Sequence, residues 1–335
     1  MSNEDPTAWV VSKSKDDFGV CVDADDYFHP QEFNPPGASV TETYYFTFSI
    51  PEQRINAFIY LWLHPNLGVL SGGVHVYQGR KTHYLGAEYY NWLDYLDASE
   101  HINGDNGSVS LPNGFGLKIK QPFHEHELTF EDKAANTRFH LIQCAAMPAA
   151  VRSGNKHFEQ NMKVEGELVL RGKKHRVECF GVRDRSWGEH RPEGHMQVPP
   201  YTWITIGSAD WALNVASFDD MKQYPHHDGS IKIPPRLFSD GWVYRDGTLT
   251  RITSCTRKTI RDDELIPQHL VEVTDKLGRN YHLHGKTVAA CMVVGWKNSL
   301  QQQTLMSWDV DGVSRWGESQ DVHWHDFERQ FRTNS

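Results

Sequence analysis

The sequence predicts an all-β protein. Residue types that favour strands occur along the whole chain of 335 residues, with 11 Trp, 13 Tyr and 16 Phe among them. Long apolar stripes with the 3.6-residue period of a helix are hard to find, whereas short runs between turn residues are frequent. A single hydrophobic core usually stops growing below this length, so two domains are expected. Regularly spaced short strands favour closed or sandwich-like antiparallel sheets, because closure removes exposed strand edges.

The first half of the chain is expected to form short antiparallel strands. Residues 44–50 place an apolar side chain at every second position, as a strand with one buried face requires. In the next run, Ile55 to Leu63, both faces are apolar, which predicts a strand between a core and a second apolar surface. Further strands are expected at 73–78, 109–111, 115–120, 127–131 and 138–144, with Asn-Gly turns at 106–107 and 113–114.

The strand pattern breaks at Met147 to Gly154 and then resumes. We therefore predict two domains, residues 1–150 and 151–335, and leave open whether segment 157–190 crosses between them. Strands of the second half are expected at 164–170, 176–180, 201–207, 212–217, 241–244, 249–260, 269–274, 281–284, 288–294 and 305–309.

Charge and cysteine content narrow the class of protein. The net charge of −9, with no cluster of Lys and Arg to offset it, opposes binding to nucleic acid or to an anionic membrane. The five cysteines are scattered and never set as Cys-x-x-Cys, which argues against a disulfide framework or a thiolate zinc site. No run approaches the length that crosses a bilayer, and the acidic N-terminus lacks the apolar region of a signal peptide. We expect a cytoplasmic protein without a nucleic-acid partner and without membrane insertion.

Two short stretches contain most of the candidate chemistry: His157-Phe-Glu-Gln160 and Gly181-Val-Arg-Asp-Arg-Ser-Trp-Gly188. Charges as dense as those of Arg183, Asp184 and Arg185 are costly to bury unless they pair. In one interpretation the two arginines clamp Asp184 at a sheet corner while Trp187 fills the core. In the other, the stretch belongs to a catalytic site.

The predicted catalytic residues are Glu159, Asp184, His157 and His190. A carboxylic acid next to aromatic walls has a raised pKa and can protonate an alkene or an epoxide, and aromatic faces stabilise the resulting carbocation. Glu159 is the predicted acid. Asp184 is the predicted organiser, because neighbouring arginines favour the charged form of a carboxylate. The chain has no G-x-S-x-G, P-loop or G-x-G-x-x-G motif, which argues against a serine hydrolase, an NTPase or a dinucleotide enzyme.

Three His-x-His pairs raise the alternative of a metal site. In a strand, side chains two residues apart project to the same face, and two metal ligands can use this geometry. The pairs are His124/His126, His282/His284 and His323/His325. Because the sequence singles out no third ligand, no metal is predicted. A metal-dependent enzyme that uses His282 and His284 remains an alternative.

The two stretches resemble a family. They are similar to bacterial proteins grouped with carotenoid 1,2-hydratase (hydroxyneurosporene synthase), whose superfamily also includes fungal decalin-forming Diels–Alderases. The similarity includes His64-Pro-Asn-Leu-Gly68 and spans about residues 40 to 320, and the Arg-Asp-Arg-Ser-Trp-Gly run is typical of one bacterial branch. The resemblance implies two lipocalin-like antiparallel β-barrel domains packed side by side, with an apolar ligand in a barrel mouth or between the domains.

Activities in that superfamily include hydration of an isoprenoid double bond and cyclisation of polyenes, neither of which needs a redox cofactor. We therefore predict a cofactor-independent lyase or isomerase that hydrates, dehydrates or cyclises a large apolar substrate such as a terpenoid, steroid or polyketide. The residues expected to bind this substrate are Arg185, Trp187, Trp62, Tyr201, Trp203 and Trp308. A second hypothesis is a lipocalin-like carrier of an apolar small molecule that performs no chemistry. No cofactor is expected, and a homodimer is compatible with the sequence.

Overall fold

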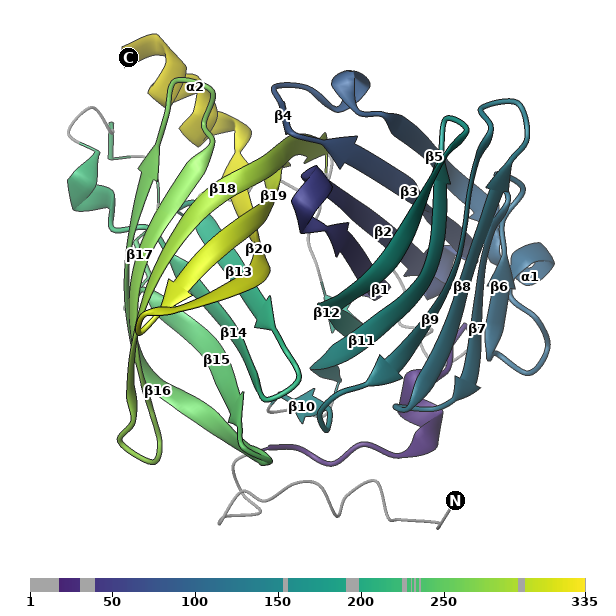
Figure 1. The fold of residues 1–335 in the computed structure, drawn as a ribbon, viewed down its shortest axis with the longest axis horizontal. Coiled ribbons are helices and arrows are strands. Elements are labelled where there is room, and N and C mark those ends of the chain that lie inside the picture. The colour runs from purple at the N-terminus through teal and green to yellow at the C-terminus, as the bar shows by residue number, and fades with distance from the viewer. Residues whose placement is uncertain are drawn as a thin grey trace.

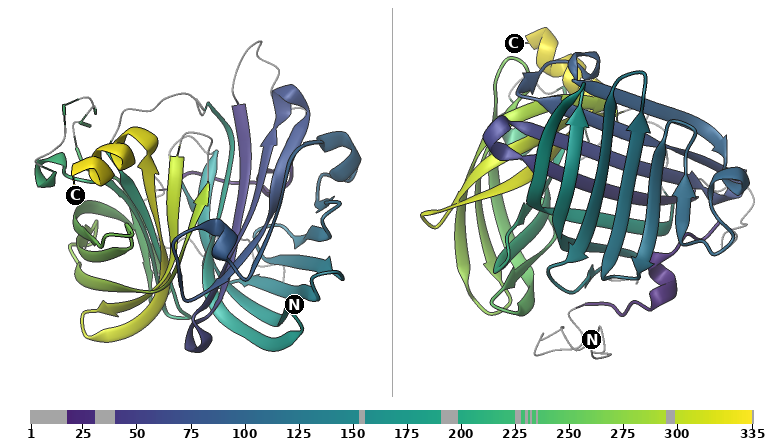
Figure 2. Two further views of the ribbon diagram at one scale, coloured as in Figure 1. Left: turned by 90° about the horizontal axis from the view of Figure 1, so that it is seen from above. Right: turned by 45° about the vertical axis from the view of Figure 1, so that its right-hand side comes forward.

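The computed structural model of the protein describes residues 18–30, 40–152, 156–190, 199–224, 228–229, 231, 233–234, 236–294 and 299–334. Two antiparallel sheets stand side by side in it, with the first sheet on the right and the second on the left of Figure 1. Figure 2 shows the same division from above. The all-β prediction is confirmed.

The first sheet is open and strongly curled. Its strands follow the spatial order β5-β3-β2-β1-β12-β11-β9-β8-β7-β6, and the short β10 pairs with β11. The strand bounds are β1 (Val40–Ile50), β2 (Ile55–His64), β3 (Val69–Gln78), β5 (Tyr89–Asp97), β6 (Ser108–Ser110), β7 (Phe115–Gln121), β8 (Glu125–Asp132), β9 (Thr137–Ala145), β10 (Ala150–Val151), β11 (His157–Leu170) and β12 (Lys173–His190).

The second sheet closes into an eight-stranded barrel, because β17 pairs with both β16 and β18. The barrel strands are β13 (Tyr201–Gly207), β14 (Trp211–Phe218), β15 (Phe238–Arg245), β16 (Thr248–Arg261), β17 (Pro267–Asp275), β18 (Asn280–Val294), β19 (Ser299–Val310) and β20 (Val313–Trp324). One piece of the first half joins it, since β4 (Arg80–Lys81) pairs in parallel with β18.

Helical segments are short. The α-helices are α1 (Ala98–His101) and α2 (His325–Asn334), and the 3-10 turns are η2 (Asp23–Asp26), η3 (Pro51–Gln53), η4 (Pro65–Leu67), η5 (Tyr84–Gly86) and η6 (Met221–Gln223). None of the helices among the described residues combines the length and apolarity that a membrane span requires.

The expected pair of lipocalin-like units is present, although the first unit is a curled open sheet and the second a closed barrel. The predicted boundary at residues 150 and 151 does not coincide with the division between the sheets. β10, β11 and β12 continue the first sheet, and the chain enters the barrel only at β13. The break in the strand pattern does not end the first sheet, because β10 within it pairs with β11, and β11 pairs with β9 after it.

Both faces of β1 and β2 are buried, as the two-sided apolar pattern of the second strand predicted. One face supplies Phe46, Phe48 and Ile59 to the core inside the curl of the first sheet. The opposite face meets the barrel. We call this contact layer the seam: Tyr45, Phe58 and Val182 from the first sheet pack there with Trp203, Ala212 and Trp242 from the barrel.

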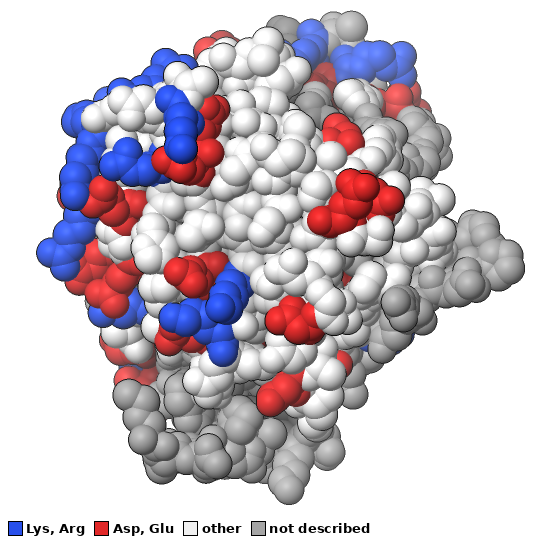
Figure 3. Space-filling view, turned by 90° about the vertical axis from the view of Figure 1, so that its right-hand side faces the viewer, with Lys and Arg blue, Asp and Glu red and all other residues white. Residues whose placement is uncertain are grey.

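On the face of the molecule seen in Figure 3, basic side chains lie next to acidic ones. Ion pairs of this kind on the first sheet include Lys120 with Glu125 at 3.0 Å and Arg176 with Glu178 at 2.6 Å. Exposed pairs of this type contribute little to stability. They do break up positive charge, so this face offers no continuous basic surface.

Candidate active site at the seam

The Arg-Asp-Arg-Ser-Trp run lies in β12, where consecutive side chains point to opposite faces of the sheet. Asp184 stands opposite Glu159 of β11 and opposite Tyr45 of β1, so these three residues share the face toward the seam. Arg183 and Arg185 project to the other face. The regular two-residue period of a strand therefore separates the aspartate from the two arginines that flank it in the chain.

Each arginine has its own carboxylate on that other face. Arg183 donates to Asp26 at 2.6 Å, and Arg185 donates to Glu42 at 2.5 Å and lies over the ring of Tyr44 at 4.1 Å. All of these side chains are buried. The interpretation in which the two arginines clamp Asp184 is therefore wrong, since strand alternation directs them away from it.

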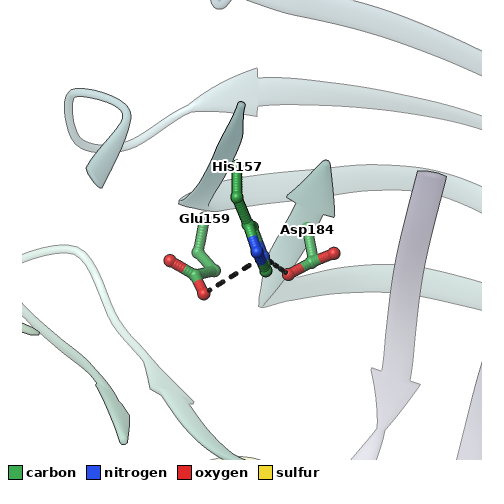
Figure 4. Close-up of side chains that lie close together, drawn as sticks. All are labelled: His157, Glu159 and Asp184. Carbon is green, nitrogen blue, oxygen red and sulfur yellow. Dashed lines mark hydrogen bonds and ion pairs between the residues drawn. The ribbon is translucent and has the colours of Figure 1, made fainter. Parts of the chain in front are cut away.

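Three side chains of the predicted catalytic set meet at the seam (Figure 4). His157 Nε2 lies 2.5 Å from Asp184 Oδ2 and 3.5 Å from Glu159 Oε1. Glu159 is fully buried, whereas the side chains of His157 and Asp184 are 13% and 14% exposed. The histidine and the aspartate therefore form the part of the site nearest to solvent.

Glu159 is held by groups from both units. Arg152, just before β11, donates to Glu159 Oε1 through Nε at 2.9 Å and also through Nη2. Trp242 of the barrel strand β15 donates its indole N–H to Glu159 Oε2 at 3.3 Å. Both carboxylate oxygens thus act as hydrogen-bond acceptors, and one of their donors comes from across the seam.

The barrel extends this network. Arg152 Nε lies 3.5 Å from Asp240 Oδ2, and Arg251 approaches both oxygens of Asp240 at 3.3 Å. Arg251 also donates to the carbonyl of Val151 at 2.6 Å. The result is a chain of neighbouring groups that alternate in charge: Asp184, His157, Glu159, Arg152, Asp240 and Arg251. With His157 protonated, the six charges cancel.

The electrostatics favour a protonated His157. Burial by itself lowers the pKa of this imidazole. The charge of Asp184, its hydrogen bond to His157 and the charge of Glu159 together outweigh burial and raise the pKa to about 9. Burial likewise opposes the charge of Arg152, yet Glu159 keeps the pKa of that guanidinium above its usual value. At neutral pH the site therefore contains the imidazolium of His157 in contact with the partly exposed carboxylate of Asp184.

The other predicted residues do not join this cluster. The side chain of His190, at the end of β12, lies outside the described part of the structure. Arg185 and Trp187 are on the opposite face of β12, where Trp187 packs against Phe158. A substrate at the seam therefore cannot use either of them.

The four remaining aromatic candidates lie in three different places. Trp203 is in the seam, 5.7 Å from the ring of Tyr45, and Trp62 lies on the seam face of β2. Tyr201 packs near Trp324. Trp308 is fully buried inside the barrel. The expectation that they line one pocket with Arg185 and Trp187 is corrected, because strand register places them on different faces and at different points of the two sheets.

The His-x-His pairs do not form a metal site among the described residues. His126 is paired with buried Asp26, His323 with Asp321, and His282 and His284 are exposed on β18. The described group that could hold a metal is His157, Glu159 and Asp184, whose ligand atoms lie within 4.8 Å of one another. The contacts of Arg152 with Glu159 compete with a cation for the same carboxylate.

Sequence reasoning missed Arg152, Asp240, Trp242 and Arg251. The only available signal was Asp240-Gly-Trp242 at the start of an expected strand, and nothing in the chain links it to Glu159. Residues 83 positions apart meet here because the barrel packs on the first sheet.

Comparisons with known proteins support the fold. The chain is similar to the crystal structure of a putative AttH from Nitrosomonas europaea, with a TM-score of 0.53, 10% identity and coverage of 89% of this chain and 97% of that chain. A second similar structure is kievitone hydratase from Nectria haematococca, with a TM-score of 0.49, 12% identity and coverage of 91% and 95%. The first likeness shows the fold alone and does not single out a branch of any family.

A search of curated proteins gives no significant match. The family model described as "Domain of unknown function (DUF7064)" matches residues 23–326, a span that includes the first sheet, the seam and the barrel. This chain therefore belongs to the DUF7064 family.

Proposed function

We propose that the protein is a cofactor-independent lyase or isomerase that hydrates, dehydrates or cyclises a large apolar substrate at the seam. The observation that carries this proposal is the contact of His157 Nε2 with the Asp184 carboxylate at 2.5 Å, beside an aromatic layer. An acid and a base in direct contact can exchange a proton and so return to their starting state after each turnover.

In a dehydration, His157 protonates the hydroxyl that leaves as water while the C–O bond breaks. Asp184, the more exposed of the two carboxylates, takes a proton from the neighbouring carbon as the double bond forms. The proton then passes from Asp184 to His157 across their hydrogen bond. Hydration is the reverse reaction. Glu159 was the acid predicted from sequence, but its contacts with Arg152 and Trp242 favour a positioning role.

Two features support an apolar substrate. The six alternating charges of the network cancel, so the site has no excess charge with which to select an ionic group. Tyr60, Tyr45, Asp184 and Glu159 stand opposite one another on consecutive strands β2, β1, β12 and β11. Three strand spacings separate Tyr60 from Glu159, a distance of about 14 Å. An elongated molecule at the seam could thus contact the half-buried ring of Tyr60 with its reactive end at His157.

The experiment that tests the proposal begins with a native mass spectrum of the purified protein, to find a bound organic molecule and identify it after extraction. That compound is then incubated with the protein in water labelled with ¹⁸O and deuterium. Incorporation of either label, lost in His157→Gln, supports the proposal. A compound that binds tightly but takes up no label with the wild-type protein contradicts it and favours the carrier hypothesis.

We also propose a cytoplasmic location. It is supported by the five cysteines, all of which are free. Fractionation of cells that express the full-length protein would test this location, and recovery in the membrane fraction would contradict it.

A further inference from the structure

A second carboxyl group, Glu318 of β20, lies in the middle of the seam and takes no part in the network of His157. Its Oε1 accepts hydrogen bonds from Thr47 Oγ1 at 2.6 Å and Asn56 Nδ2 at 2.5 Å, and its Oε2 accepts one from Tyr45 Oη at 2.6 Å. All three donors belong to β1 and β2 of the first sheet. One barrel side chain thus gathers three hydrogen bonds across the seam.

Within the described part of the structure, no ion pair balances the charge of Glu318. Two other buried glutamates each pair with an arginine: Glu42 with Arg185, and Glu159 with Arg152. The ion pairs among the described residues do not include Glu318. Glu318 also borders a narrow pocket whose walls include the apolar side chains of Phe180, Val182 and Leu305. An ionised carboxylate held only by neutral groups beside an apolar wall is costly to bury.

The titratable groups that act on Glu318 remain neutral over the physiological range. Burial raises the pKa of Tyr45 and of Tyr77 well above 10, and burial raises the pKa of the Cys179 thiol to about 12. For Glu318 itself, burial raises the pKa and outweighs the hydrogen bonds from Thr47, Tyr45 and Asn56. As the carboxylic acid among these groups, Glu318 is the member that ionises first as pH rises.

We propose that Glu318 is a proton-controlled latch between the first sheet and the barrel. With its carboxyl group neutral, the seam is closed. Ionisation places an uncompensated charge in the seam and weakens the contact between the two units. The hydrogen bond from Trp242 to Glu159 and the ion pair of Arg152 with Asp240 cross the same seam, so the latch also controls whether the candidate active site is assembled.

The direction of the pH effect follows from the raised pKa of Glu318. A group whose pKa is higher in the folded than in the unfolded state gives stability that is fully present below its unfolded pKa. That stability is lost as pH rises through the folded pKa. The seam is therefore tightest under mildly acidic conditions and loosens toward alkaline pH.

The variant that tests the latch is Glu318→Gln. A glutamine can accept from Thr47 and Asn56 through its oxygen, and its nitrogen can donate to Tyr45 Oη. The O–H of the neutral acid makes the same reversed hydrogen bond to Tyr45, but glutamine cannot ionise. We expect equal melting temperatures for variant and wild type at pH 5 and a variant that is several degrees more stable at pH 8.5. Because His157 is present in both proteins, its titration cancels in the difference. A difference that does not change with pH would overturn the proposal.

Hydrogen exchange followed by mass spectrometry locates the effect. At pH 8.5 the wild type should exchange faster than Glu318→Gln in β1, β2 and β20, and both proteins should exchange equally in β7 and β8. Equal exchange in all of these strands would overturn the latch. Because hydrogen exchange is measured without substrate, its result does not depend on the proposed enzymatic function.

A second variant keeps the test valid if Glu318→Gln does not fold. Thr47→Val removes one donor to the carboxylate, and charge-assisted hydrogen bonds are stronger than neutral ones, so its loss of stability should grow from pH 5 to pH 8.5. Thr43→Val is the matched control, because this buried threonine on the same face of β1 bonds to Ser186 at 2.7 Å. Its loss should be the same at both pH values. Parallel behaviour of the two variants would contradict the latch.

Discussion

The protonation states in the candidate site depend on which charged group each ionisable side chain contacts. Asp184 is flanked in the chain by two arginines, yet its partner is His157, 27 positions away. This pairing raises the pKa of His157 to about 9, so its imidazole is protonated at neutral pH. The same residue types with other partners, such as His126 beside Asp26 and Arg183, have the opposite behaviour, since burial and Arg183 lower the pKa of His126.

The first prediction concerns the pKa of His157. In Asp184→Asn the anion that raises this pKa is lost, so the value should fall from about 9 to below 7, as burial and Arg152 both oppose the imidazolium. The titration can be followed by NMR through the ring proton of His157. In Asp240→Asn, which removes a more distant anion, the value should fall much less. An unchanged pKa in Asp184→Asn would contradict the assigned pairing.

The second prediction is a dependence of stability on pH. Because the pKa of His157 is raised, its contribution is fully present below pH 6.5 and is lost as pH rises through about 9. His157→Gln should therefore reduce the free energy of unfolding at pH 6 by about 3 kcal/mol more than at pH 10. Urea unfolding at the two pH values measures this difference. Equal losses at both would show that the imidazolium pair contributes nothing to the fold.

At the scale of single elements, β12 has two functions because its two faces differ. The seam face holds Asp184 and Ser186, and the other face buries Arg183, Arg185 and Trp187 in ion pairs and aromatic contacts. Mutations at adjacent positions should therefore have different kinds of effect. Changes on the face that holds Arg183 and Arg185 should mainly lower the free energy of unfolding. Changes on the seam face should mainly alter turnover of the substrate.

The third prediction tests this division. Arg185→Met leaves the buried carboxylate of Glu42 without its partner, and loss of one member of a buried pair typically costs about 3–5 kcal/mol. The double variant Glu42→Gln/Arg185→Met should recover part of that loss. Denaturant unfolding of the three proteins gives the values. A ligand found by mass spectrometry should bind the folded variants as it binds the wild type, and a selective loss of binding would instead restore Arg185 to the site.

At the scale of the whole molecule, the site exists only where the curled sheet and the barrel meet. Glu159 and Arg152 come from the first unit, and Trp242, Asp240 and Arg251 come from the second. Contacts across the seam therefore connect the stability of the assembly with the geometry of the site.

The fourth prediction measures that connection. Trp242→Phe keeps an aromatic ring in the seam but removes the N–H that donates to Glu159, which should cost about 1–2 kcal/mol of stability. In a double-mutant cycle with Glu159→Gln, the two changes should be non-additive by about 1 kcal/mol, because they remove the same hydrogen bond. Thermal or urea unfolding of the four proteins provides the cycle. If the losses of unfolding free energy are strictly additive, this contact does not couple the two units energetically.

Much of the fold and half of the site could be predicted from local pattern. Alternating and two-sided apolar runs indicate strands such as β2, and the motif positions of His157, Glu159 and Asp184 identify the residues that meet. The aromatic candidates could not be sorted, because the face to which Trp308 or Trp187 points depends on strand register. The point at which the chain passes from the first sheet to the barrel could not be read for a similar reason: a turn within a sheet and a linker between sheets have the same composition.

The sequence by itself determined the all-β class, the two-unit organisation and the stretches that supply His157, Glu159 and Asp184 to the candidate site, because strand periodicity and motif spacing are local properties. Only the tertiary structure decided that Asp184 pairs with His157, that Arg183 and Arg185 face away, and that Trp242 and Glu318 complete the seam. Those pairings join residues distant in the chain. The register of β1, β11 and β12 and the packing of the barrel on the sheet set these pairings. No short stretch of the sequence determines the register or the packing.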